Sequence, residues 1–211
     1  MDKNSSYIQS WTKQINSVKT DTENMLVNRY FLKEYFAIVQ KNKRIQNPRD
    51  FHDWVTGNYY CAIVMNIRRQ LDIRNDSISF LKLLKEIEKN PEILSRYWYK
   101  NTHQYDWADV DFTNNAGSGS FIDKKIVNGD IKKLKDLGSR IEKFGDEYFA
   151  HRSKNPTTSK LTIKEVDDFI DQFESIVKRY FLLFTAGGYE TFLPVWQYNW
   201  QEIFNYRWLK K

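Results

Sequence analysis

The chain is 211 residues long and carries an excess of six positive charges. Hydrophobic residues make up 41% of it and charged residues 28%, with only eight glycines and four prolines. This composition excludes a disordered chain and favours a single helix-rich domain over residues 1–211. The positive balance favours polyanionic partners such as nucleic acids, because lysines and arginines that neutralise phosphates release condensed counterions.

Several kinds of site lack their sequence patterns here. The single cysteine, Cys61, excludes an internal disulfide and a cysteine-only metal site, and its apolar neighbours predict that it is buried. There is no glycine-rich phosphate loop, no serine-nucleophile elbow and no zinc-ligand spacing. The first residues lack the apolar core of a signal peptide, and no apolar run approaches the roughly 20 residues that span a bilayer. We therefore expect a cytoplasmic protein with no cofactor, no metal and no membrane contact.

Two long helices are predicted at the start of the chain. Apolar residues recur at three- and four-residue steps from residue 5 to about residue 41, which marks one face of a helix. Asn47 and Pro48 break this pattern. They predict a second helix that has Asn47 as its cap and Pro48 at its first position and runs to about residue 73. Its broad apolar surface indicates a central, largely buried element.

A third helix and an insertion follow. Asp76 and Ser77 predict a helix start, and that helix ends near residues 90–91. Residues 97–122 mix aromatic residues, acids and a Gly/Ser tract. This mixture predicts an irregular loop insertion with a mobile tip around residues 116–120.

The second half of the chain returns to helical periodicity. Apolar residues at three- and four-residue steps predict a helix over residues 123–149, and a turn follows at 153–159. Thr162 can cap the next helix, with Glu165 completing a capping box, and Gly187–Gly188 stop it. Strand-like alternation is absent beyond a few residues. The predicted fold is therefore all-α, an antiparallel helical bundle with a loop insertion.

The C-terminal segment, residues 189–211, is rich in aromatic residues beside cations. These are Trp196, Tyr198, Trp200, Phe204, Tyr206 and Trp208, with Arg207, Lys210 and Lys211. Aromatic faces next to cations can stack nucleobases. The favoured interpretation is a terminal helix docked on the bundle or on a second subunit, because aromatic residues dominate interfaces in general.

Three histidines are the candidates for acid–base chemistry near neutral pH. His151 ends the run RIEKFGDEYFAHR, where it can act in chemistry or simply interact with the last helix carbonyls. His52 is interpreted as surface polarity. His103 lies near Asp106, Asp109 and Asp111, and an acidic loop is favoured there over a metal site because the spacing defines no ligand geometry.

Three segments, in order, resemble the abortive-infection type of HEPN domain. They are NIRRQLD at 66–72, DSISFLKLL at 76–84 and FGDEYFAHR at 144–152. The resemblance covers about residues 51–184. It implies an all-α bundle that dimerises with its histidine-bearing helices face to face. It also implies a metal-independent ribonuclease of phage defence or a toxin–antitoxin system, in which an arginine and a histidine form the catalytic pair.

The histidine of that pair matches His151, and Asp146 resembles the polar residue that follows the arginine. The arginine is missing. Four to six residues separate the pair in the family, which points to positions 144–146, and the residue before Asp146 is Gly145. Cleavage needs a cation at the charge that develops on the phosphate. Arg152, beside His151, is therefore assigned to the catalytic group with His151 and Asp146.

Other cations are assigned to RNA binding: Arg68, Arg69, Arg74 and Lys143. Arg68, Arg69 and Arg74 can be brought alongside His151 by the bundle. On a straight helix Lys143 lies roughly 12 Å before His151 and cannot touch the same phosphate. The alternative for Arg68 and Arg69 is ion pairing with Asp72 and Asp76. Because Arg68 and Arg69 are neighbours on a helix, their side chains cannot both face the same way.

The leading hypothesis is a HEPN-like protein of bacterial phage-defence or toxin–antitoxin type that is directed at RNA. It would be a homodimer and, if active, a metal-independent endoribonuclease. The alternative is a non-catalytic dimeric helical module that pairs with a nucleotidyltransferase antitoxin or another protein. The missing arginine favours the module, and the positive charge and His151 favour the ribonuclease.

Overall fold

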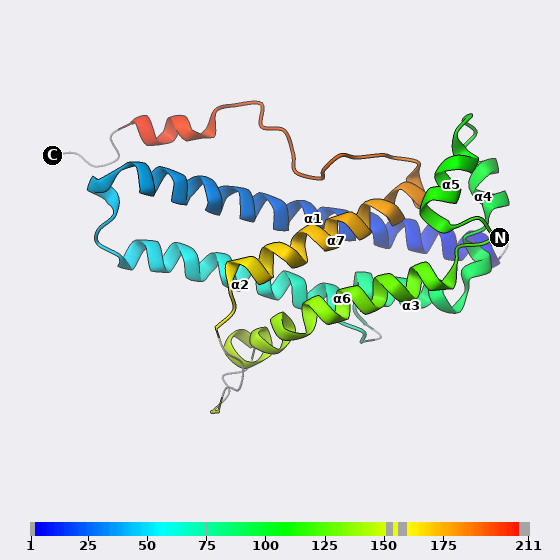
Figure 1. Ribbon diagram of the computed structural model, residues 1–211, viewed down its shortest axis with the longest axis horizontal. Helices are drawn as coiled ribbons and strands as arrows, with labels where there is room; N and C mark the ends of the chain where they lie inside the picture. Colours follow the sequence, from blue (N-terminus) through cyan, green and yellow to red (C-terminus); the bar gives the residue numbers. More distant parts are fainter. Residues whose placement is uncertain (1–2, 75, 151–153, 156–159, 207–211) are drawn as a thin grey trace.

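The computed structural model describes residues 3–74, 76–150, 154–155 and 160–206. In these ranges it contains helices and one isolated bridge, between Ser95 and Phe121, but no strand. Four long helices, α1 (Lys3–Lys41), α2 (Asp50–Leu71), α6 (Lys124–Gly145) and α7 (Ile163–Thr185), form an antiparallel bundle (Figure 1). The predicted all-α bundle is confirmed.

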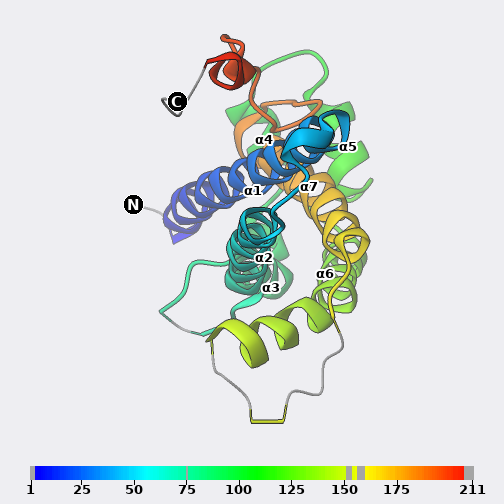
Figure 2. The same cartoon turned by 90° about the vertical axis from the view of Figure 1, so that its left-hand side faces the viewer.

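Shorter elements complete the bundle. The short helix α3 (Phe80–Lys89) packs on α6, α1 and α2. The other short elements are η1 (Lys43–Ile45), η2 (Pro91–Ile93), α4 (Arg96–Thr102), α5 (Ala108–Ala116), the π-helical turn η3 (Asp146–Ala150) and η4 (Trp200–Asn205). Seen from the end that carries the α1–α2 turn, α1, α2, α6 and α7 surround a shared interior (Figure 2).

The core of the bundle is aromatic and closely packed. Its largest fully buried side chains include Trp11, Phe80, Phe169, Phe173 and Tyr180. The most extensive helix contact is between α1 and α7. At Gly138 three helices converge, because a Cβ there would collide with Leu71 of α2 and lie 3.1 Å from the ring of Phe169 of α7. Close packing of this kind fixes the positions of the helix ends that carry the candidate site.

A buried ion pair joins α6 to α7. Arg179 Nη1 donates to both carboxylate oxygens of Asp130, at 2.9 and 2.6 Å, and the hydroxyl of Tyr180 donates to Oδ2 at 3.0 Å. Asp130 is 7% exposed. Burial, together with the adjacent carboxylate, raises the pKa of Tyr180 well above its ordinary value, which keeps the phenol protonated as a donor.

Two helix starts differ from prediction. Helix α2 begins at Asp50 rather than Pro48, with Arg49 and not Asn47 in the cap position; the carbonyl of Arg49 accepts the first helical hydrogen bond. Its first turns are also exposed rather than central, with Phe51 58% and Trp54 63% accessible. The fully buried residues of α2 begin only at Tyr59, and before it Val55 is partly buried against the core.

Helix α3 begins after Ser79 rather than after Ser77. The Ser79 hydroxyl accepts from the amide of Lys82 and also bonds the carbonyl of Asp72, while Gln70 accepts from the amide of Phe80. The end of α2 therefore decides where α3 starts, and residues 76–79 form the link. The predicted end of α3 near residues 90–91 is confirmed.

The predicted irregular insertion at 97–122 is wrong, because α4 and α5 occupy most of it. Tyr99 and Phe112 are fully buried, with ring centroids 5.7 Å apart, and join this part to the core of the bundle. The guanidinium of Arg96 donates to the carbonyls of Gly117 and Gly119 at 2.8 and 3.0 Å. The tip is thus tied back to α4 by contacts that no local pattern reveals.

The capping box at the start of α7 is confirmed. The Thr162 side chain accepts from the amide of Glu165 at 3.2 Å, and Glu165 Oε2 accepts from the amide of Thr162 at 2.9 Å. The helix ends at Thr185, and Ala186, rather than one of the two glycines, adopts the left-handed conformation with φ of 54°. The predicted stop is therefore displaced by one residue.

Replacing Thr162 by alanine is expected to lower the free energy of unfolding by about 1 kcal/mol, because an amide donor of the first helical turn loses its acceptor. Urea denaturation gives this value. Thr20→Ala, at an exposed position inside α1, is the control and is expected to be neutral or slightly stabilising. Equal midpoints for the two variants would contradict a stabilising capping box.

The C-terminal segment runs back along α1 (Figure 1). Trp196 stacks on Tyr30 with ring centroids 5.6 Å apart, and Trp200 meets Phe31 edge-on at 4.8 Å. Gln201 Nε2 donates to Glu34 at 2.7 Å. The predicted docking on the bundle is confirmed for these residues, but the described part of the segment is extended and forms the 3-10 turn η4 rather than an α-helix. Arg207, Trp208, Lys210 and Lys211 lie outside the described residues. Cys61, predicted to be buried, is only partly so.

Candidate functional site

Gly145, the last residue of α6, lies directly against α2. A Cβ at this position would be 2.8 Å from Val64 Cγ1 and 3.6 Å from Arg68 Cδ. Real Cβ contacts do not fall as short as the first of these, so the two helices approach this closely because residue 145 has no side chain. The position at which the predicted catalytic arginine is missing is therefore occupied from outside by side chains of α2.

Arg68 projects from α2 onto the start of the π-helical turn. Its Nε donates to Oδ1 of Asp146 at 2.5 Å, joining two residues that are 78 apart in the sequence. The two side chains are 31% and 45% exposed. Among the described residues, Nε is the only nitrogen of this guanidinium with a hydrogen-bond acceptor. Its two Nη groups keep their donors for a ligand.

A groove of about 200 Å³ lies beside Arg68, between the ends of α2 and α6. Arg74 and Asp72 line it, and they are paired through Nη2 and Oδ2 at 2.6 Å. The hydrogen bonds from Arg74 hold the pKa of Asp72 below its ordinary value. The groove thus brings together two of the predicted RNA-binding residues, Arg68 and Arg74.

Glu142 lines the same groove and was not among the predicted site residues. Burial raises its pKa, and the carboxylate of Asp146 adds to the rise, while Arg68 opposes it. In the sequence, Glu142 could have been found from its position one helical turn before Asp146, which puts both residues on the same face of α6. Glu142 is the second carboxyl group that interacts with the Arg68 guanidinium.

Arg69 lies on the other side of α2. Its Nη2 donates to Asp21 of α1 at 2.6 Å and to Asn66 at 3.1 Å. Asp21 also accepts from Gln70 at 2.6 Å. The structure therefore separates Arg69 from Arg68 and does not bring Arg69 to the groove. The prediction that these neighbours face different ways is confirmed, with Asp21 rather than Asp72 or Asp76 as the partner of Arg69.

The π-helical turn Asp146–Ala150 leads directly to His151 in the sequence. Tyr148 and Phe149 in it are 45% and 37% exposed, and Tyr148 stacks on Phe144 at a centroid distance of 4.5 Å. Lys143 is 58% exposed on α6, with its amino group 4.0 Å from Glu147. His151 and Arg152, predicted for the catalytic group, lie outside the described residues.

The other two histidines have structural surroundings. His52 is not simple surface polarity: its Nε2 bonds the carbonyl of Ile45 at 2.6 Å and its Nδ1 bonds the Tyr35 hydroxyl. It ties the start of α2 to α1 and η1. His103 packs against Trp98 and Tyr99, and burial lowers its pKa.

Two acids near His103 have partners of their own: Asp109 pairs with Arg96 and Lys100 at 3.1 Å each, and Asp111 accepts from Tyr105 at 2.6 Å. Within the described residues no three His, Cys, Asp or Glu side chains come together as a metal site.

The HEPN_AbiU2 family model, described as AbiU2, matches residues 20–204, which is most of the chain. Comparison with curated proteins gives no match, and neither does comparison with solved structures. None of the helices in the described ranges is both long enough and apolar enough to cross a membrane.

Proposed function

The chain belongs to the AbiU2 family of HEPN domains, and we propose from this that it is an RNA-directed protein of phage defence that cleaves RNA without a metal. In this proposal His151 acts as base or acid, and Arg68 supplies the cation that α6 lacks. The observation that carries the proposal is the position of Arg68, whose side chain lies beside Gly145 and is bonded to Asp146.

In the proposed reaction His151 and Arg68 act together on one phosphate of the RNA. His151 removes the proton of a ribose 2′-hydroxyl, and the 2′-oxygen attacks the adjacent phosphorus. The bond from phosphorus to the 5′-oxygen breaks, and that oxygen takes up a proton from water, while His151 returns the proton that it accepted to the solvent. The products are a 2′,3′-cyclic phosphate and a free 5′-hydroxyl. The Nη donors of Arg68, with Arg152, stabilise the charge on the pentacovalent phosphorus, and Asp146 positions Arg68 through Nε.

We further propose that two copies of the chain pair around this region. The exposed rings of Tyr148 and Phe149, next to His151 in sequence, support such an interface because aromatic residues are enriched in interface cores. A nucleotidyltransferase antitoxin is the protein partner that the family resemblance implies. The presence of glycine at position 145, where the family pattern calls for an arginine, favours one alternative. This is a non-catalytic module that keeps the bundle and the dimer.

The test is cleavage of single-stranded RNA in excess EDTA, followed by identification of the product ends. We expect cyclic-phosphate products from the wild type and a loss of about 100-fold or more in His151→Ala and Arg68→Ala. Arg69→Ala is the matched control, since Arg69 neighbours Arg68 but pairs with Asp21, and it is expected to keep full activity. If the RNA stays intact with the wild-type protein, or if all four proteins cleave it equally, the ribonuclease is refuted and the interaction module is left.

A further inference from the structure

Helix α6 carries a face of exposed lysines. This lysine face consists of Lys124, Lys125, Lys132, Lys133, Lys135 and Lys143. Asp136 is the one acidic residue exposed on α6, because Asp130 is buried against Arg179 and Glu142 is partly buried in the Arg68 groove. Of the six lysines only Lys143 has a carboxylate of the described residues within 4.0 Å of its amino group. The face therefore holds positive charge that the protein does not neutralise.

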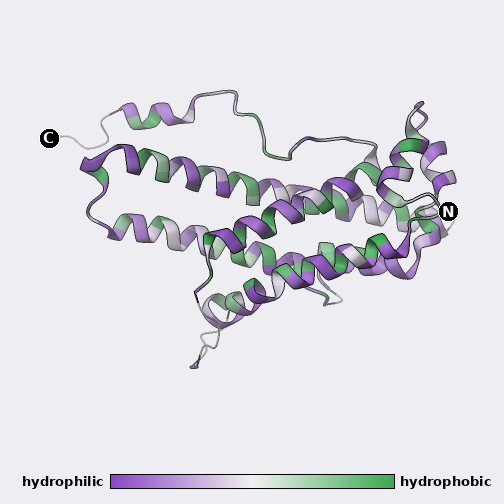
Figure 3. Cartoon of the chain, in the orientation of Figure 1, coloured by the Kyte–Doolittle hydropathy of each residue, from purple (hydrophilic) through white to green (hydrophobic). Residues whose placement is uncertain are grey.

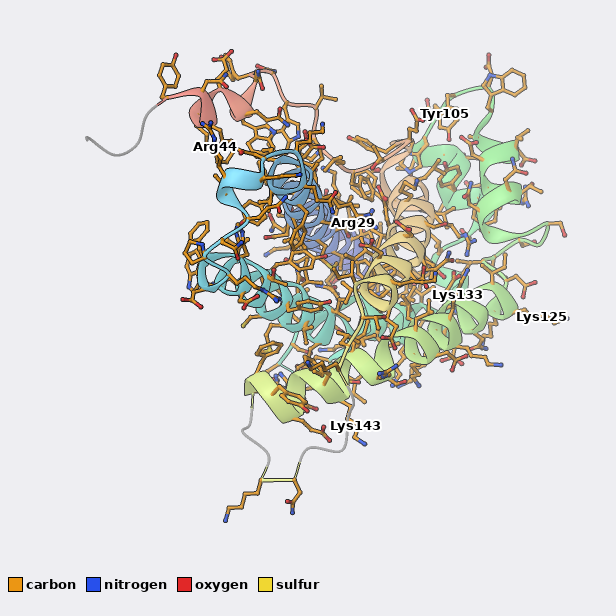
Figure 4. The ribbon with its side chains drawn as sticks, turned by 60° about the vertical axis from the view of Figure 1, so that its left-hand side comes forward. Arg29, Arg44, Tyr105, Lys125, Lys133 and Lys143 are labelled. Carbon is orange, nitrogen blue, oxygen red and sulfur yellow. The ribbon has the colours of Figure 1, made fainter. Side chains whose placement is uncertain are left out.

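The lysines are arranged along a line. At about 100° per residue, Lys125, Lys132 and Lys143 lie within roughly 20° of one another around α6, with rises of about 10 Å and about 16 Å between them. The exposed Asp136 lies on the same line, between Lys132 and Lys143, so the lysines outnumber the carboxylate there but are not uninterrupted. Lys133 and Lys135 flank that line by about 80° on either side. Figure 4 places Lys125, Lys133 and Lys143 from the start of α6 to its end. The 22 residues of α6 give the face a straight length of about 33 Å.

One edge of the lysine face joins the candidate site. A groove of about 320 Å³ between α3 and α6 is lined by Lys135, Lys85 and Ser139, and also by Leu71, Ile73 and Glu142. The groove beside Arg68 is lined by the same Leu71, Ile73 and Glu142. The two grooves are therefore neighbours that share a wall. Together they lead from the middle of the lysine face to Arg68 and Asp146.

We propose that the lysine face binds the phosphate backbone of RNA, independently of sequence, and guides the strand toward Arg68. This inference rests on the proposed function for its direction but names a separate binding surface. Phosphates are the partner that fits, because evenly exposed lysines without interleaved aromatic rings contact charge rather than bases.

Two other partners fit less well. A membrane surface would need an exposed apolar side on α6, but the apolar residues of this helix, among them Val127, Ile131, Leu134 and Ile141, are buried in the core, and the hydrophilic ones lie around the rest of the helix (Figure 3). A second copy presenting the same face would bring like charges together.

The experiment measures binding of a fluorescent 20-nucleotide RNA with 2′-O-methyl groups, which cannot be cleaved, by anisotropy over a range of salt. The test variant replaces Lys125, Lys132 and Lys143 by glutamine. The matched control replaces Lys13, Lys41 and Lys43, three exposed lysines of α1 and η1, and so removes the same charge. Wild type is measured beside them.

We expect the test variant to bind at least 10-fold more weakly at low salt and its slope of log affinity against log salt to fall by about 2, since each lost phosphate contact removes about 0.7. The control is expected to stay within about 2-fold of wild type. Equal losses of affinity in the test variant and the control, or no binding by wild type, would overturn the proposal that the lysine face binds RNA. Lysine-dependent binding of this RNA, combined with a wild-type protein that leaves unmodified RNA intact in the EDTA assay, would support the lysine face while refuting the ribonuclease.

Discussion

Gly145→Arg is expected to destabilise the protein instead of restoring an active site, although it puts arginine where the family pattern predicts one. A Cβ at residue 145 would lie 2.8 Å from Val64 Cγ1, so α6 and α2 would have to separate. Overpacking of this kind costs about 1–3 kcal/mol or more. For a chain of this size that corresponds to a fall in melting temperature of roughly 3–10 °C. Differential scanning calorimetry measures it directly.

Gly129→Arg is the matched control, because Gly129 lies on the same helix, is exposed and has nothing within 4 Å of the point where a Cβ would stand. It is expected to be neutral or slightly stabilising, as glycine is a poor helix former. Adding Val64→Ala to Gly145→Arg should recover part of the loss by making room. A Gly145→Arg variant that melts at the wild-type temperature would show that α6 and α2 are not in this close contact.

Asp130→Ala is expected to give a comparably large loss. It leaves the Arg179 guanidinium and the buried Tyr180 hydroxyl without the acceptor that both use. Breaking a buried pair from one side costs about 3–5 kcal/mol, and we expect roughly 2–4 kcal/mol here because the Arg179 side chain is 32% exposed. Guanidinium denaturation followed by circular dichroism measures the change.

Asp168→Ala is the control for Asp130→Ala. Its partner Lys164 is 82% exposed, and surface pairs of this kind contribute below about 1 kcal/mol. The double variant Asp130→Ala/Arg179→Leu should lose less than the sum of its two single variants, because it removes the charge along with its partner. Equal stability of the Asp130 and Asp168 variants would mean that the buried pair does not hold α6 on α7.

Local patterns predicted the long helices well. The Thr162–Glu165 capping box and the steps of α1, α6 and α7 are properties of neighbouring residues, and each leads to the element observed. The start of α3 depends instead on the end of α2, through Ser79 and Asp72. The helices α4 and α5 are supported by Arg96 and a buried Tyr99–Phe112 contact, which join residues distant in the chain.

The candidate site shows the same division. Adjacent positions on one helix predicted that Arg68 and Arg69 face apart, and they do. The partnership of Arg68 with Asp146 could not be predicted, since it depends on α6 approaching α2 at Gly145 and on the interior at Gly138. Gly145, where the family pattern calls for an arginine, is also the residue that lets α6 approach Val64 of α2, one helical turn before Arg68. The roles of His151, Asp146 and Arg152 remain proposals for the cleavage test.

The pairing of α1 with α7 has a consequence for synthesis of the protein. Helix α1 ends at Lys41 and its principal partner ends at Thr185, with 144 residues between those points. At about 5–20 residues per second, a ribosome needs on the order of 7–30 s to cover that stretch. Throughout this interval Trp11 of α1 lacks the ring of Phe184, which it meets edge-on at a centroid distance of 6.3 Å, so the growing chain leaves this part of α1 open to chaperones.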